Sequence, residues 1–91
     1  NYVYANESDM LNVALFGVTA SEWRKTNLDK EGNMRDYANI EQLVVLSNME
    51  SINSVLIRQG LSQSKRLVQL NRIAITQMTS LINNTQLKKL K

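Results

Sequence analysis

Side chains capable of acid–base or metal chemistry are few in this sequence. The chain has no histidine and no cysteine, which excludes imidazole bases, thiol nucleophiles, disulfides and Cys/His zinc sites. Glu41 and Glu50 are the candidates for a carboxylate pair, but nine residues place them on opposite sides of about two and a half helical turns. We interpret both as solvated charges and predict no enzyme activity, no metal and no other cofactor.

Hydroxyl groups and glycines also lack the neighbours that chemistry requires. Thr19, Ser21 and Ser62 stand where they can cap helices, and none has a nearby base that would activate it as a nucleophile. The three glycines stand apart from one another at predicted turns. No phosphate-binding loop is therefore expected.

Gly17 separates two short helical patterns, as the turn of a helix-turn-helix motif does. That motif usually has a small residue about four positions before the glycine, whereas Val13 stands there. Trp23, in the second helix, is better suited to anchor a core than to read bases. We do not favour sequence-specific DNA binding by this segment.

Charge is divided unevenly along the chain, which carries 11 basic and 8 acidic residues. All the acids lie in residues 1–50, and residues 51–91 contain bases only. Either the acidic and basic halves pack against each other, which we favour, or the basic half binds a polyanion. In the second case the candidate nucleic-acid contacts, which would bind phosphates without reading sequence, are Arg58, Lys65, Arg66 and Arg72.

Length and composition favour a single small helical domain. The chain has 91 residues, no proline and three glycines, and it is rich in aliphatic residues, serine, asparagine and glutamine. No apolar run reaches the roughly 18 residues of a membrane span, and the first residues do not have signal-peptide form. We expect a cytoplasmic protein without a membrane segment. Because the sequence does not begin with methionine, we also expect a further domain upstream.

The longest apolar segment, residues 39–59, is predicted to be a central helix. Asn39 can cap its first turn with Gln42 as the reciprocal partner, and Gly60 supplies the left-handed residue that ends such a helix. Aliphatic side chains cover most of its circumference, so we expect neighbours on several sides. A second long helix at about residues 63–83 completes an antiparallel α-hairpin. Facing positions in this hairpin predict an ion pair between Glu50 and Arg72.

Two short helices, at about residues 7–16 and 20–26, are expected to pack over the hairpin. Trp23 is the predicted buried anchor of the second. The polar segment 27–33 is predicted to be a mobile loop.

Tyr37 is expected to contact the first turn of the central helix, and residues 84–91 are expected to form a frayed basic tail. The predicted fold class is therefore all-α, a small four-helix domain with two short N-terminal helices packed on a long antiparallel α-hairpin.

The last long helix has an apolar arc wider than one neighbouring helix requires. Val68, Ile75 and Ile82 lie at one edge of this arc and are the candidate interface residues. Core packing within the monomer is the alternative explanation for all three.

Several strings of residues stand in a fixed order along the chain. They are Tyr4-Ala5-Asn6-Glu7, Leu11-Asn12-Val13-Ala14-Leu15-Phe16-Gly17, Glu22-Trp23-Arg24, Gly32-Asn33, Arg35-Asp36-Tyr37-Ala38 and Glu41-Gln42-Leu43. Together these strings resemble a region downstream of the DNA-binding module in bacterial and prophage KilA-N domain proteins. The resemblance covers most of the chain, more loosely through the hairpin, and contains no catalytic signature.

KilA-N proteins occur in phages and large DNA viruses and bind DNA through their namesake domain, which these 91 residues do not contain. The resemblance therefore implies a helical companion domain and assigns no DNA-binding residue to this chain. We consider two functions. The first is non-enzymatic self-association or binding of a protein partner, and the second is direct, sequence-independent binding of nucleic acid by the basic half.

Overall fold

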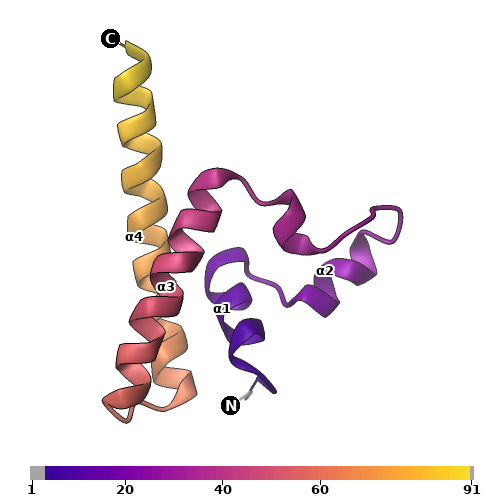
Figure 1. The fold of residues 1–91 in the computed structure, drawn as a ribbon, viewed down its shortest axis with the longest axis vertical. Coiled ribbons are helices and arrows are strands. Elements are labelled where there is room, and N and C mark those ends of the chain that lie inside the picture. Colours follow the sequence, from indigo (N-terminus) through magenta and orange to yellow (C-terminus); the bar gives the residue numbers. More distant parts are fainter. Residues whose placement is uncertain (1–3, 91) are drawn as a thin grey trace.

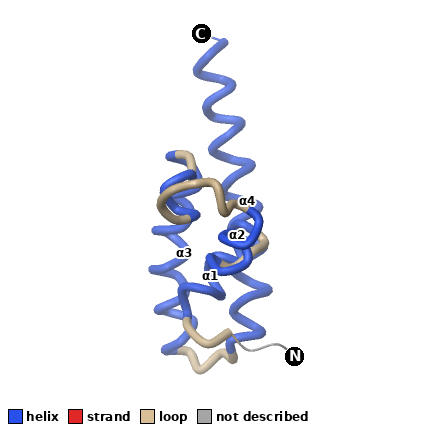
Figure 2. Tube along the Cα trace, turned by 90° about the vertical axis from the view of Figure 1, so that its right-hand side faces the viewer, coloured by secondary structure: helices blue, strands red, loops and turns tan. Residues whose placement is uncertain are grey.

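The computed structural model describes residues 4–90, with the side chains of residues 4–83. Two long helices form an antiparallel hairpin, and α1 lies across one face of it (Figures 1 and 2). The all-α prediction is confirmed over this range. The elements, in chain order, are α1 (Glu7–Phe16), α2 (Ala20–Thr26), the 3-10 helix η1 (Met34–Tyr37), α3 (Ile40–Arg58) and α4 (Gln63–Leu90).

Local capping signals explain where the helices begin. Asn39 and Gln42 form a reciprocal capping box at the start of α3, and Thr19 caps α2, as predicted; Glu22 completes a second reciprocal box with Thr19. At α1 the cap is Asn6, whose side chain accepts a hydrogen bond from the backbone N–H of Asp9. These side chains satisfy backbone donors that have no partner inside a helix.

The core lies where α1, α3 and α4 meet. Met10, Met49, Leu70 and Val45 are completely buried there, so each of the three helices contributes. The aliphatic residues of α3 are not all covered, because α1 and α4 are the described helices that make extensive contact with it. The exposed ones are Ile40, Leu43, Val44, Val55 and Ile57.

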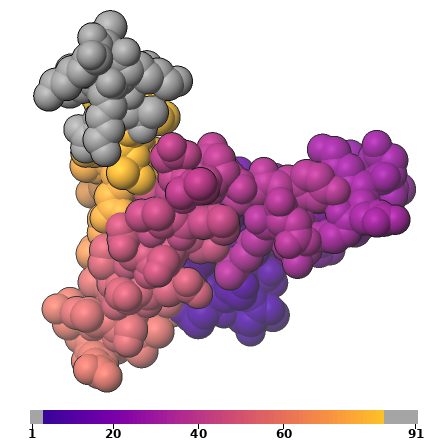
Figure 3. Space-filling model, turned by 45° about the horizontal axis from the view of Figure 1, so that its top comes forward, coloured from indigo at the N-terminus to yellow at the C-terminus, as the bar shows by residue number. Residues whose placement is uncertain are grey.

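The prediction that both short helices pack over the hairpin is wrong for α2. This helix contacts η1 and forms with it an arm that stands out from the hairpin (Figure 3). It has no buried residue, and Trp23 is only partly covered, with its ring 5.4 Å from that of Tyr37. The only apolar residues of α2 are Ala20 and Trp23, too few to bury a face against the hairpin.

Tyr37 lies near the first turn of α3, since it lines one hollow together with Gln42, but it is not a core residue. Its side chain is half exposed, and its hydroxyl donates a hydrogen bond of 2.6 Å to the carbonyl of Glu31. Arg24 donates a second bond of 2.6 Å to the carbonyl of Lys30. These bonds help to hold the loop at residues 27–33 to the arm, and its mobility stays a prediction.

The α4 helix continues to Leu90 and does not end near Asn83. No glycine or proline interrupts residues 84–90, and the glutamine, leucine and lysine residues there are good helix formers. The backbone of the predicted frayed tail is therefore helical as far as Leu90, and the side chains of residues 84–91 lie outside the described part. Beyond the start of α3, α4 has no neighbouring helix (Figure 1).

The predicted ion pair between Glu50 and Arg72 is wrong: no such pair forms between these two described side chains. Near Glu50, the polar side chain of α3 that contacts α4 is Asn48, which donates a hydrogen bond of 3.0 Å to Gln77. Because Asn48 faces α4, Glu50, about 200° further round α3, faces away from it.

Candidate interaction surface

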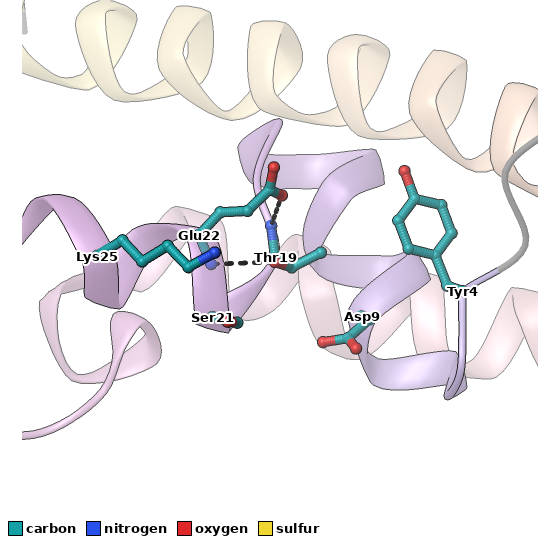
Figure 4. Close-up of a pocket in the computed structure, with 6 residues that line it drawn as sticks. All are labelled: Tyr4, Asp9, Thr19, Ser21, Glu22 and Lys25. Atoms are coloured by element: carbon teal, nitrogen blue, oxygen red, sulfur yellow. Dashed lines mark hydrogen bonds between the residues drawn. The ribbon is translucent and has the colours of Figure 1, made fainter.

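A polar cleft lies between α1 and the α2 arm (Figure 4). Glu22 is committed there to helix capping, since Thr19 donates its backbone N–H to the carboxylate at 2.8 Å and accepts the Glu22 N–H at 3.1 Å. Hydrogen bonding of the Glu22 carboxylate to Thr19, to its backbone N–H first and to its side chain second, lowers the pKa of Glu22. The cleft, of about 390 Å³, is lined by Tyr4, Asp9, Thr19, Ser21, Glu22 and Lys25.

The side chains of this cleft do not form a reactive constellation. Asp9 and Glu22 point to different sides of Thr19, and Ser21 has no imidazole or carboxylate bonded to it (Figure 4). Across residues 4–83, no three carboxylates gather where they could hold a metal ion. We assign no chemistry to the cleft.

Arg66, one of the candidate nucleic-acid contacts, is buried inside the domain. The residue is 8% exposed, and its guanidinium binds both carboxylate oxygens of Glu7 at 2.9 Å. It also donates to the Asn53 side chain at 3.0 Å and to the Leu61 carbonyl at 2.7 Å. Arg66 therefore joins α1, α3 and the hairpin turn, and it is removed from the possible phosphate contacts.

The same network fixes the charge of Glu7. Burial alone would raise the pKa of this carboxyl, but hydrogen bonds from Asn53, Gln63 and Arg66 outweigh that effect and lower the pKa. An acid from the first half and a base from the second are thus paired, as the first explanation of the charge asymmetry requires. One feature of the sequence indicates this buried network: Asn53 and Arg66 each interrupt the apolar face of a helix.

The other three basic candidates are exposed. Lys65 and Arg72 lie seven residues apart and so share one face of α4, whereas Arg58 belongs to the last turn of α3. No acidic residue occurs between positions 51 and 83. These positions are accessible, but only two of them are brought together on one helix.

The three candidate interface residues are on the surface. Val68, Ile75 and Ile82 are 51%, 60% and 47% exposed, which rules out complete burial inside this monomer. Successive members are seven residues apart, so they follow one line along α4. We call these three residues the α4 stripe.

At Ile75 and Ile82 the stripe is uncovered because α1 is short. The Asn71 side chain donates a hydrogen bond of 2.9 Å to the carbonyl of Ala14, near the end of α1. The chain then turns at Gly17 towards the arm, while α4 continues without α1 beside it (Figure 1). Ile75 and Ile82 therefore border only the end of α1, and a longer α1 would cover more of both.

Two shallow hollows lie along the stripe where α1 meets α4, and Asn71 lines both. The hollow at Val68, of about 300 Å³, is lined by Val13, Leu67, Val68, Asn71 and Arg72. The hollow at the other end, of about 290 Å³, is lined by Ala14, Leu15, Asn71, Ala74, Ile75, Met78, Thr79 and Ile82.

The exposed aliphatic residues of α3 form a less continuous surface. Val44 and Val55 share one side of α3, but Asn48 and Ser51 lie between them. On the other side, Glu50 is exposed between Leu43 and Ile57. These residues were predicted to be covered, and sequence periodicity alone does not reveal that neighbours are missing.

Comparison with models of known protein families gives no match, and neither curated proteins nor solved structures match the chain significantly. Within the described residues, no helix is both long enough and apolar enough to span a bilayer. The interpretation of the surface therefore depends on its own geometry.

Proposed function

We propose that this chain is a non-enzymatic association domain that binds a helix along the α4 stripe. The observation that supports this proposal is a line of three half-exposed β-branched side chains with seven-residue spacing. Solvent-facing positions of a helix usually carry polar residues, whereas this spacing is typical of a seam between paired helices. An exposed apolar patch of this regularity is expected to have a partner.

The energy available from the stripe is modest. Fully burying a valine or isoleucine side chain contributes about 1.5–3 kcal/mol, so covering the exposed half of three contributes roughly 2–4 kcal/mol. Association itself costs about 4–15 kcal/mol in lost freedom of the two molecules. The stripe therefore needs either contacts from the neighbouring hollows or a second stripe on the partner, and we expect binding in the micromolar range or weaker.

The resemblance to KilA-N proteins gives this proposal a biological setting. A companion domain that associates would hold two DNA-binding units in one complex. Each unit would then raise the effective concentration of the other at neighbouring sites. In this setting the association domain increases DNA affinity without contacting DNA.

Sedimentation equilibrium of the chain over a wide concentration range tests the proposal. We expect the average mass of the wild type to rise with concentration and that of an Ile75→Glu variant to stay at the monomer value. Val55→Glu on α3 is the matched control, because this residue is 51% exposed outside the stripe, and it should associate like the wild type. Equal masses for all three proteins, monomeric up to millimolar concentration, would contradict self-association through the stripe.

Sequence-independent nucleic-acid binding is the second candidate function, and it is supported by the shared face of Lys65 and Arg72 in a segment without acids. Neutralising Arg58, Lys65 and Arg72 should weaken binding of a labelled duplex and flatten its dependence on salt. If the wild-type chain does not shift the duplex at low salt, this candidate is excluded.

A further inference from the structure

We infer that the partner of the α4 stripe is a second copy of this chain, lying antiparallel to the first about a two-fold axis at Ile75. The inference rests on the proposed function, since it specifies the occupant of the same surface. It begins from a symmetry in the stripe. Val68 and Ile82 are each seven residues from Ile75, so antiparallel pairing places Val68 of one copy opposite Ile82 of the other at both ends.

The polar residues between the stripe positions follow the same symmetry. With Ile75 on the axis, Asn71 of one copy lies opposite Thr79 of the other. The Asn71 side chain donates one of its two amide protons to the Ala14 carbonyl, so the other proton can be donated elsewhere. The Thr79 hydroxyl donates to the Ile75 carbonyl at 2.8 Å, and its oxygen can still accept a hydrogen bond. Each Asn71 can therefore donate to the facing Thr79.

Charge favours the antiparallel arrangement over the parallel one. A parallel pair would place Arg72 beside Arg72 and Lys65 beside Lys65, and no acid between positions 51 and 83 could compensate. In the antiparallel pair, each Arg72 lies three residues before the Ile75 of its own helix, so the two arginines are on opposite sides of the axis. At 1.5 Å of rise per residue, the two Arg72 Cα atoms are then about 9 Å apart along the helix direction, whereas a parallel pair places them level with each other.

The two hollows provide matching space for the stripe residues of a second copy. Ile82 of the second copy would enter the hollow at Val68, and its Val68 would enter the hollow at Ile82. This insertion of side chains between side chains is the packing found in paired helices. The pattern is self-complementary, so one surface supplies both halves of the interface.

The size of the surface indicates which residues must take part. A stable interface covers about 800 Å² on each partner, whereas the stripe is only about 21 Å long over its 14-residue span. The hollow walls contributed by α1, Val13 and Leu15, must therefore contact the second copy. In a two-fold pair these contacts occur at both ends.

Single-cysteine variants test this arrangement directly, because the chain has no cysteine of its own. We would introduce Ile75→Cys, Val68→Cys and Ile82→Cys separately, and oxidise each under mild conditions at a concentration where the wild type associates. Ser80→Cys, exposed on another side of α4, is the matched control. Circular dichroism confirms that each variant keeps the wild-type helix content.

The antiparallel pair predicts that Ile75→Cys forms a disulfide dimer at least tenfold faster than Ser80→Cys, since its two sulfurs meet at the axis. Val68→Cys and Ile82→Cys should each react slowly alone and quickly when mixed in equal amounts. If Val68→Cys alone reacts as fast as Ile75→Cys, the pair is parallel, which overturns the inference and leaves the association function standing. If sedimentation shows association but no variant exceeds the control, the occupied surface is not the stripe. If the wild type stays monomeric, a second copy is not the occupant.

Discussion

Replacing Arg66 by methionine tests the main buried interaction of the domain. Methionine keeps the unbranched stem of arginine and removes the guanidinium, which bonds Glu7, Asn53 and the Leu61 carbonyl. Asn53 is 4% exposed and retains only the bond from its amide nitrogen to Glu7, at 2.9 Å. Its carbonyl oxygen loses the Arg66 donor in a place that water does not easily reach.

The expected cost follows from which groups water can reach after the change. An unsatisfied buried carbonyl costs about 1–3 kcal/mol, and here it belongs to Asn53. Breaking a fully buried ion pair costs about 3–5 kcal/mol, but the Glu7 side chain is 43% exposed and regains water. The added methionine carbons recover part of the loss by packing. We therefore expect Arg66→Met to destabilise the domain by about 2–3 kcal/mol.

Urea unfolding followed by circular dichroism measures this difference, at low micromolar concentration where association is negligible. In thermal unfolding, where a domain of this size loses about 4–8 °C per kcal/mol, the melting temperature should fall by about 10–20 °C. Arg72→Met is the matched control, because it removes the same group from an exposed position and should change stability by less than about 0.5 kcal/mol. Equal stabilities for the two variants would refute the buried network.

Three further predictions concern single positions. The pKa of Glu7 is lower in the folded chain than its ordinary value of 4.5, so its contribution to stability is present above that pH and is lost as the pH falls through the folded pKa. Glu7→Gln should therefore reduce the acid sensitivity of urea unfolding relative to wild type, and unchanged sensitivity would contradict this. Gly60→Ala should lower the free energy of unfolding by about 1–2 kcal/mol, because Gly60 has a φ of +81°, which strains any residue with a Cβ. The strain is in the backbone alone, since no atom lies near the added Cβ. A neutral result in thermal melting would show that the turn adopts another conformation. Asn39→Ala should cost about 1 kcal/mol by loss of the cap on α3, with Asn83→Ala as an exposed control that leaves the melting temperature unchanged.

The helix boundaries could be read from the sequence because capping is a local effect. Thr19 with Glu22, and Asn39 with Gln42, are three residues apart, so each pair identifies a helix start without knowledge of the fold. The sequence prediction ends α4 too early, near residue 83, because it interprets the basic residues 84–91 as a frayed tail. Lysine is in fact a good helix former, and no breaker follows.

The buried network could not be found in the same way. Glu7 and Arg66 are 59 residues apart in sequence, and their pairing depends on how α1 crosses the hairpin. The sequence indicates such a network only indirectly, because Asn53 and Arg66 each lie within an otherwise apolar helix face. A polar residue in such a place needs a partner when it is buried, although the pattern does not say which residue that partner is.

The position of α2 also depends on contacts that the local sequence does not determine. Its capping box makes the helix predictable, but a helix packs where its apolar face finds another. Trp23 is the one large apolar side chain of α2, and it is covered by Tyr37 at 5.4 Å and by the Arg24 guanidinium at 5.1 Å from its ring. A single tryptophan with such neighbours completes a small arm and does not require the hairpin.

The same reasoning identifies α4 as the helix to test first for association. Both long helices expose aliphatic residues, because α1 covers only one face of the hairpin and ends near Asn71. On α3 these residues alternate with Glu50 and with serine and asparagine, so no straight partner could cover them without also burying polar groups. On α4 the stripe keeps its seven-residue spacing, with Asn71 and Thr79 able to pair across the axis. Regular spacing together with polar groups that can find partners is what a specific interface requires and what incidental surface exposure does not produce.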